Sequence, residues 1–310
     1  MSIHVLLLLV VVPVAPPELH VAAAMVQDAG KVEVGKVEVI EERYADGTPK
    51  LRREVRRDKD GVVNHGLFQS WHPNAQISRT GRAVDGRWEG LVLDYYINGK
   101  LKDESEYKRG VRHGRHNTYW YEGEVKRIES YKDGALHGRF EDYRFGPGLK
   151  SVEGQYVDGK EDGVWKEYDN AGAVLSEGAY KLGAKHGLWI TRNAAGQKTM
   201  EETYRDGLID GVSREFAPTG ERLVEVHYKA GKSEGVRTEW YLSGVKKSEN
   251  GYIGGVPNGR SAAWFEDGKP QVEGEMKAGK RNGRWTFWNA DGSVNAAWSG
   301  VYENDKRIGD

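Results

Sequence analysis

The sequence contains no cysteine, little proline and few apolar residues for its length. Among its 310 residues there are 0 Cys and 9 Pro, and hydrophobic residues make up only 38%. The absence of cysteine excludes disulfide bonds, cysteine-ligated zinc and thiol catalysis. The low proline content argues against a disordered Pro/Gly tract. The small apolar fraction argues against a globular enzyme with a thick core.

Net charge is also lacking. The 46 Lys and Arg residues balance 47 Asp and Glu residues, which leaves a formal charge of −1. No overall field favours a nucleic acid or an anionic membrane, so we expect no nucleic-acid partner. What the sequence has instead is 41 Gly, 10 Trp and 16 Tyr. Solvated disordered chains lack such aromatics, and the combination is typical of a thin, turn-dense β structure.

Long hydrophobic runs are missing except at the N-terminus. Residues 5–14 read VLLLLVVVPV, which is shorter than the ~20 apolar residues of a spanning helix. The run suits the core of a secretory signal, and the small residues at 22–24 suit a cleavage site. We therefore predict a signal peptide over residues 1–24 and export to the periplasm or the extracellular space. Because residues 1–4 carry no Lys or Arg, an uncleaved anchor and a start at Met25 remain alternatives.

Glycine recurs with a period of 24 residues, occasionally 25. One unit, residues 159–182, reads GKEDGVWKEYDNAGAVLSEGAYKL, and the next begins at Gly183. The equivalents of Gly159, Gly163 and Gly172 in the other units form three columns, called here the first, second and third. Together these columns hold 29 of the 41 glycines. Asp-Gly and Asn-Gly pairs are frequent in the columns and supply the positive φ angles of tight hairpin turns. We therefore predict that all three columns lie at hairpin turns.

The segments between these glycines predict an all-β fold. They are about seven to ten residues long, close to the usual strand length, and several alternate charged with apolar residues. Each unit is predicted to be a β-hairpin. About ten hairpins then stack into an elongated, single-layer antiparallel meander over residues 61–302. Residues 25–60 are expected to form a linker with a degenerate repeat, and residues 303–310 a short tail.

Aromatic residues also form columns. In almost every unit a ring stands five residues after the second glycine, as at Tyr168, with Arg192 as an exception; a Tyr stands eight residues after the third, as at Tyr180. We expect these rings to form ladders that stabilise the stack. Trp165 and Tyr168 have opposite strand parity, so either a bulge realigns them or both faces bear rings.

Rings outside these columns are candidates for contact with a partner. Trp88 stands out because the short segment between Gly86 and Gly90 is predicted to be a turn, where burial is least expected. The candidate partner-binding residues are Trp88, Tyr96, Trp120, Tyr121, Tyr241 and Phe265.

A column of His and carboxylate residues precedes the second glycines, as at His113, His137 and Asp162. Such residues ligate metals, but equivalent positions of adjacent units lie ~9–10 Å apart and cannot share one ion. We expect polar turn residues at these positions, and no metal site. The sequence has no nucleophile elbow, phosphate loop or dinucleotide fingerprint, so we expect no enzyme and no cofactor.

The unit resembles the MORN repeat variant of bacterial YwqK-like proteins, a family often described as antitoxin-like. Its pattern is filled here by Gly163, Trp165, Tyr168, Gly172, Tyr180 and Gly183. The resemblance covers about residues 61–302 and departs from the pattern, for want of a ring, at Arg192, Ser213, Arg237, Ser261 and Met276. It implies hairpin-repeat sheets that serve in scaffolding and partner binding and, in eukaryotic relatives, in lipid contact.

Our leading functional hypothesis is an exported, non-enzymatic repeat protein that acts as a scaffold for a protein partner. One alternative is a module at the cell envelope that binds glycans or lipid headgroups through exposed aromatics. Another is a toxin-neutralising protein, as the antitoxin-like resemblance implies. A homodimer through the aromatic face also remains open, because exposed rings would form a large apolar patch.

Overall fold

The computed structural model describes residues 36–59 and 61–310, which contain 24 β-strands and no helix, hence none that could cross a membrane. The predicted signal peptide, residues 1–24, lies outside these described residues. The strands of the first half are β1 Val37–Arg43, β2 Pro49–Asp58, β3 Gly61–Trp71, β4 Ile77–Val84, β5 Arg87–Trp88, β6 Gly90–Tyr95, β7 Leu101–Lys108, β8 Val111–Tyr119, β9 Val125–Lys132, β10 Ala135–Tyr143, β11 Lys150–Val157 and β12 Lys160–Tyr168. Those of the second half are β13 Val174–Lys181, β14 Ala184–Arg192, β15 Lys198–Arg205, β16 Leu208–Phe216, β17 Arg222–Lys229, β18 Lys232–Trp240, β19 Lys246–Ile253, β20 Val256–Trp264, β21 Pro270–Lys277, β22 Lys280–Phe287, β23 Gly300–Glu303 and β24 Lys306–Gly309.

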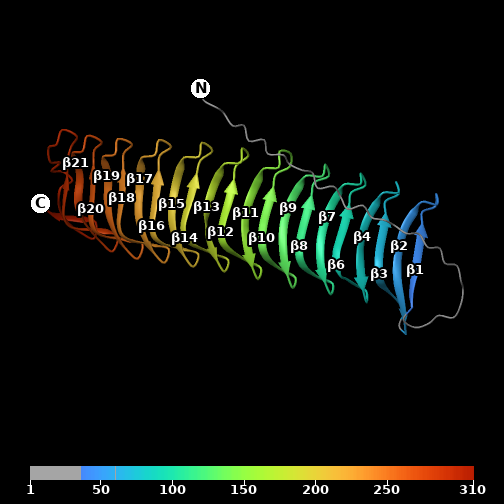
Figure 1. The fold of residues 1–310 in the computed structure, drawn as a ribbon. Coiled ribbons are helices and arrows are strands. Elements are labelled where there is room, and N and C mark those ends of the chain that lie inside the picture. The colour runs from blue at the N-terminus through green and yellow to red at the C-terminus, as the bar shows by residue number, and fades with distance from the viewer. Residues whose placement is uncertain (1–35, 60) are drawn as a thin grey trace, which may run out of the picture.

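The strands form one antiparallel meander in chain order. Each strand pairs with the next, except that both the two-residue β5 and β6 pair with β4. Figure 1 shows the strands side by side in a single row, from β1 in blue to the C-terminal strands in red. The predicted all-β hairpin meander is confirmed. The sheet runs from Val37 to Gly309 and so extends beyond the predicted range at both ends.

The first and third glycine columns lie at hairpin turns, as predicted. In the first type of turn both central residues have positive φ, 49° at Asp158 and 80° at Gly159, which is the type I′ conformation that matches strand twist. In the second type, the Gly172 N–H donates to Asp169 C=O at 3.2 Å and the Asp169 N–H to Ala173 C=O at 2.8 Å. The two turn types alternate along the chain and mark the two long edges of the sheet.

The second glycine column lies at β-bulges inside strands, so its predicted place at hairpin turns is wrong. Between β11 and β12 the pairs Glu153–Lys166 and Gln155–Asp162 leave Gly154 opposite three residues, 163–165. Gly163 takes a φ of +71° there, and a bulge makes the same demand for positive φ as a turn does. The glycine pattern alone therefore could not separate the two.

The parity question raised by Trp165 and Tyr168 has a definite answer: both faces of the sheet bear rings. Trp165 pairs with Gly178, whereas its neighbour Lys166 pairs with Glu177 on the opposite face. The Tyr168 hydroxyl donates to Glu153 Oε1 at 2.6 Å, and Glu153 pairs with Lys166. We call the two sides the tryptophan face and the glutamate face.

The tryptophan face carries the core. Residues two positions after the second glycines turn inward there, and Trp165, Trp189 and Trp285 are only 8%, 6% and 5% exposed. Each of these indole N–H groups donates to a backbone carbonyl ten residues earlier, at 3.0–3.2 Å. The indole polar atom is thus satisfied as its ring is buried. At Ser213, Arg237 and Ser261 this column lacks a ring.

A zigzag of rings joins three consecutive units on the tryptophan face. Neighbouring centroids are 5.1–6.5 Å apart along the series Phe140, Tyr156, Trp165, Tyr180, Trp189 and Tyr204. Most contacts are edge-to-face, a geometry worth about 0.5–1.5 kcal/mol per pair beyond area burial. The tyrosine column therefore serves the stacking function that the sequence predicts for it.

The glutamate face carries a line of carboxylates across six units. Its members occupy one register row, in which each glutamate pairs with a residue of the intervening strand: Glu153, Glu177, Glu201, Glu225, Glu249 and Glu273. Arg192 Nη2 donates to Glu177 Oε1 at 2.6 Å, just as the Tyr168 hydroxyl donates to Glu153. This explains why Arg192 can replace a ring in its column.

Candidate functional site

Four of the six predicted partner-binding residues occupy equivalent positions at one edge of the sheet, where each strand enters the turn of the third glycine: Tyr96, Trp120, Tyr241 and Phe265. All four are half-buried. The Tyr96 hydroxyl donates to Tyr119 C=O at 2.9 Å and the Tyr241 hydroxyl to Trp264 C=O at 3.0 Å. Each of these two tyrosines therefore joins its own unit to the following one, a contact called here the tyrosine clamp.

Tyr121 joins this edge and is 47% exposed. Its ring lies 5.1 Å from that of Tyr96, and the Trp120 ring lies 5.6 Å from Phe145, which is 56% exposed. Lys126 Nζ lies 4.7 Å from the centre of the Trp120 ring. The structure thus gathers three of the predicted residues, with Phe145, into one aromatic edge cluster (Tyr96, Trp120, Tyr121 and Phe145).

Trp88 is not at a turn, which corrects the expectation for this residue. The turn is at Asp85 and Gly86, and Trp88 lies on β5 opposite Ala83. Its half-buried ring meets Phe68 edge-on at 5.2 Å. Strand pairing resumes at Arg87, directly after the type I′ turn, so Trp88 lies in a strand and packs against the core.

The His and carboxylate column is not a set of turn residues, which corrects that expectation. All of these residues lie in strands except Glu89, which stands between β5 and β6. Several accept the backbone N–H of the following type I′ turn. Examples are Arg109 N–H to Glu89 Oε2 at 2.6 Å, Gly254 N–H to Glu234 Oε2 at 2.8 Å and Asp133 N–H to His113 Nδ1 at 3.3 Å. Within residues 36–59 and 61–310, no group of three potential ligands could hold a metal ion.

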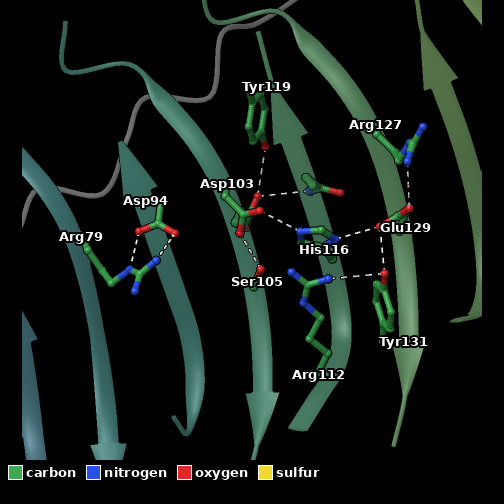
Figure 2. Close-up of polar contacts among 12 residues, drawn as sticks. Arg79, Asp94, Asp103, Ser105, Arg112, His116, Tyr119, Arg127, Glu129 and Tyr131 are labelled. Carbon is green, nitrogen blue, oxygen red and sulfur yellow. Dashed lines mark hydrogen bonds and ion pairs between the residues drawn. The ribbon is translucent and has the colours of Figure 1, made fainter. Parts of the chain in front are cut away.

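A buried polar cluster that the sequence did not reveal centres on His116 of β8, in the core column that holds Trp or Phe in half of the units (Figure 2). Its Nε2 lies 2.7 Å from Asp103 Oδ2 on β7, and its Nδ1 lies 2.8 Å from Glu129 Oε2 on β9. Ser105 Oγ donates to Asp103 at 2.5 Å, and the Tyr131 hydroxyl donates to Glu129 at 3.1 Å. His116 and Glu129 are both 6% exposed.

The carboxylates hold His116 as a cation. Burial alone would lower the pKa of His116, but hydrogen bonds to Asp103 and Glu129 outweigh burial and raise the pKa to about 8. Burial opposes ionisation of Asp103 and Glu129 as well, yet their hydrogen bonds with His116 leave both pKa values lowered. Two ionised acids on either side of a protonated imidazole form a compensated buried ion triad.

Two flanking ion pairs extend the triad across the tryptophan face. Arg79 binds Asp94 through two hydrogen bonds of 2.5 and 2.8 Å (Figure 2). Arg127 binds Asp142 through two hydrogen bonds of 3.2 Å. Because the Ser105 hydroxyl donates to Asp103 and not to His116, the cluster does not activate a hydroxyl nucleophile. The cluster keeps a proton on His116 and joins the three strands β7, β8 and β9 through hydrogen bonds.

An apolar stripe runs across the glutamate face, one register row away from the glutamates. Its rungs stand directly after the second glycines on alternate strands, at Val164, Leu188, Val212 and Val236, with Ala179, Thr203, His227 and Gly251 on the strands between. Val164, Leu188 and Val236 are 61%, 51% and 46% exposed. The eight stripe residues include no Asp, Glu, Lys or Arg. The residue two positions before each rung borders the stripe, as His186 does opposite Ala179, and it is Asp210 or Glu234 in the next two units. The column of the rungs continues as Arg139 on one side and Arg260 on the other.

The MORN repeat variant family matches residues 88–109 and 161–182. These two segments are therefore similar to MORN repeat variants. The first MORN segment includes Trp88 and Tyr96, and the second includes Trp165 and Tyr180, which stack in the core. The remaining units repeat the same hairpin geometry in the same sheet.

Beyond the two segments that match the MORN repeat variant, the chain has little similarity to other proteins. No curated protein matches the sequence. The chain is similar to part of two solved structures, described as crystal structures of TcdB2-TccC3-Cdc42 and TcdB2-TccC3, with 11% identity in each case. The alignments cover 79% of this chain and 16% of those chains, with TM-scores of 0.19 and 0.16.

Proposed function

We propose that this chain is a non-enzymatic scaffold that binds a protein partner on its open sheet. The exposed apolar stripe carries the proposal. Val164, Leu188 and Val236 stand at one position in three of four successive units and stay roughly half exposed, although fully burying such a side chain contributes about 1.5–3 kcal/mol relative to full exposure. Apolar side chains in a continuous exposed row mark interaction surfaces. The MORN resemblance, which implies partner binding, agrees with this function.

Capture followed by titration tests the scaffold function. The tagged full chain is used to isolate partners from envelope extracts, and each candidate is then purified and titrated against the chain by calorimetry. A saturable complex with one purified protein supports the proposal. Failure of every candidate to bind, together with hydrolytic activity of the purified chain, refutes it.

We also propose that the protein is exported, on the strength of the apolar run at residues 5–14 and the small residues at 22–24. N-terminal sequencing of the mature protein tests this, with cleavage after Ala24 as the expected result. A mature chain that starts at Met1 and remains in the cytosol would instead favour the toxin-neutralising role implied by the YwqK-like resemblance.

The aromatic edge cluster favours glycan or lipid-headgroup binding as a second function. Tyr121 and Phe145 expose rings that could stack on a sugar, and Trp120 Nε1 is a buried donor with no acceptor in the described part of the chain. An unpaired buried donor costs about 1–3 kcal/mol, which a ligand oxygen would recover. Glycan-array and liposome binding that Trp120→Ala and Tyr121→Ala abolish would establish this function, and binding that survives both would exclude it.

A further inference from the structure

We infer that the apolar stripe on the glutamate face receives one amphipathic α-helix of the partner, lying along the array and across the strands. This inference rests on the proposed scaffold function and specifies the partner's chemistry. It is carried by three features of the stripe: its repeat distance, its width and its composition.

The repeat distance of the stripe matches a heptad. The rungs Val164, Leu188, Val212 and Val236 stand on every second strand, so adjacent rungs lie about 9.6 Å apart at ~4.8 Å per strand. Seven residues of α-helix rise about 10.5 Å and return to the same helical face within ~20°. A helix with an apolar residue at every seventh position therefore meets successive rungs with an offset of about 0.9 Å per interval, or about 2.7 Å over three, which is within the reach of a side chain.

The width of the stripe suits one helix. Charged rows border the stripe on both sides: the glutamate line with Lys166 and Arg214 on one, and Lys181, Arg205 and Lys229 on the other. A strip about 29 Å long and as wide as a helix, ~10 Å, offers on the order of 300 Å². A stable interface between globular partners needs ~800 Å² per side, so a second copy of this chain would have to bury the charged rows too.

The residues between the rungs leave space for the side chains of such a helix. The positions between the rungs hold small or polar residues, Ala179, Thr203 and Gly251 among them, so rungs alternate with shallow gaps. Apolar residues three or four positions beyond each seventh-position contact fit these gaps, as in other helix-in-groove recognition. The arginines at the two ends of the column, Arg139 and Arg260, bind Glu141 and Glu273 at 2.6 and 3.0 Å, and their other guanidinium N–H groups suit acidic residues at the ends of the helix.

A designed peptide tests the inference with the full-length protein. The probe is a fluorescently labelled 28-residue peptide, with Leu at every seventh position, Ala three positions beyond, balanced Glu and Lys elsewhere and acidic ends. The control peptide has the same composition with the heptad scrambled. The protein variants are Leu188→Gln with Val236→Gln on the stripe, and Leu242→Gln, a control residue that is 64% exposed outside the stripe.

We expect saturable binding of the heptad peptide, a gain of peptide helicity on binding, and at least tenfold weaker binding to the double stripe variant. Leu242→Gln should bind like the wild type. Because Leu188 and Val236 are about half exposed, the double variant should retain the wild-type unfolding temperature, which is measured in parallel. Should it unfold early, Val164→Gln alone replaces it.

Four outcomes overturn the inference: no binding, equal binding of the scrambled peptide, binding without a gain in helicity, or binding that ignores the stripe substitutions. A wild-type dimer that Leu188→Gln dissociates would assign the stripe to a second copy and would also overturn it. Each of these results leaves the scaffold function intact if a purified partner still binds the full chain. Loss of every protein partner would refute both.

Discussion

Trp165 lies across Gly154, with the fused-ring atoms of its indole directly above the glycine Cα. A Cβ built on Gly154 would come closer than 3.0 Å to Cδ2, Cε2 and Cε3 of that indole. Gly178 stands in the same relation to Trp189, and Gly274 to Trp285. A fourth glycine column thus provides the floor on which the buried tryptophans lie.

Gly178→Ala should destabilise the protein by about 1–3 kcal/mol, the cost of overpacking a core. Gly178 has no positive φ, so the penalty is steric and not conformational. Urea unfolding of the full chain measures it. Gly309→Ala is the control, since no atom would lie within 4 Å of its new Cβ, and it should be neutral. A neutral Gly178→Ala would show that the indole can move aside at no cost.

Leu182→Asn should stabilise the protein by about 1 kcal/mol. Leu182 has a φ of +53° in its type I′ turn, and a left-handed conformation costs an ordinary L-residue about 1–2 kcal/mol, whereas Asn tolerates it. Asp206 occupies the equivalent position with a φ of +50°, so Asp206→Leu should lower stability by a similar amount. Thermal unfolding of both variants decides, and equal changes of the same sign would contradict the argument.

The His116 triad predicts a stability that falls in mild alkali. The pKa of His116 is raised above its unfolded value of 6.5 to about 8, so its stabilisation is complete below pH 6.5 and is lost as the pH rises through 8. The shift corresponds to about 2 kcal/mol. The free energy of unfolding, measured by urea titration at pH 6 and pH 9, should show this loss.

His116→Gln should remove this pH dependence, and it should also lower stability at pH 6, because Asp103 and Glu129 would lose their cation. His113→Gln, a change outside the triad, should keep the wild-type profile. A wild-type stability that stays flat from pH 6 to pH 9 would contradict a charged His116.

Tyr241→Phe should cost about 1 kcal/mol, the usual net value of one hydrogen bond. The lost bond joins the Tyr241 hydroxyl to Trp264 C=O in the next unit at 3.0 Å. Tyr121→Phe is the matched control at the same edge, because the Tyr121 hydroxyl has no hydrogen-bond partner among the described residues. Chemical unfolding compares the two, and equal stability of both variants would mean that the tyrosine clamp adds nothing.

The residue patterns predicted the strands and their order in the meander, but not which residues pair across neighbouring strands. Glycine and aspartate at fixed spacing predicted the turns at Asp158 and Gly172, since these residues adopt positive φ or form tight turns by themselves. The bulge at Gly163 uses the same residue for another purpose, so it was mistaken for a turn. The Gly154–Trp165 contact left a sequence signal, a glycine eleven residues before each buried tryptophan, which becomes meaningful only once strand pairing is known.

The candidate site was harder to predict. Tyr96 and Tyr241 looked free because they lie outside the ring columns, yet their hydroxyls reach carbonyls 23 residues away. His116 was missed although it stands in the core column with Trp165, because its partners Asp103 and Glu129 lie on two other strands. Val164 and Leu188 were overlooked because an isolated exposed aliphatic is ordinary; their alignment across strands makes the stripe.

The sequence by itself determined the all-β hairpin repeat, its 24-residue period and the residues at its turns, because turn chemistry and strand alternation are local properties of the chain. Only the tertiary structure decided which face each column occupies, since the bulges at the glycines of the second column set the register between strands. That register buries Trp165 over Gly154, closes the His116 triad between β7 and β9, and leaves the apolar stripe of β12–β19 exposed on the other face.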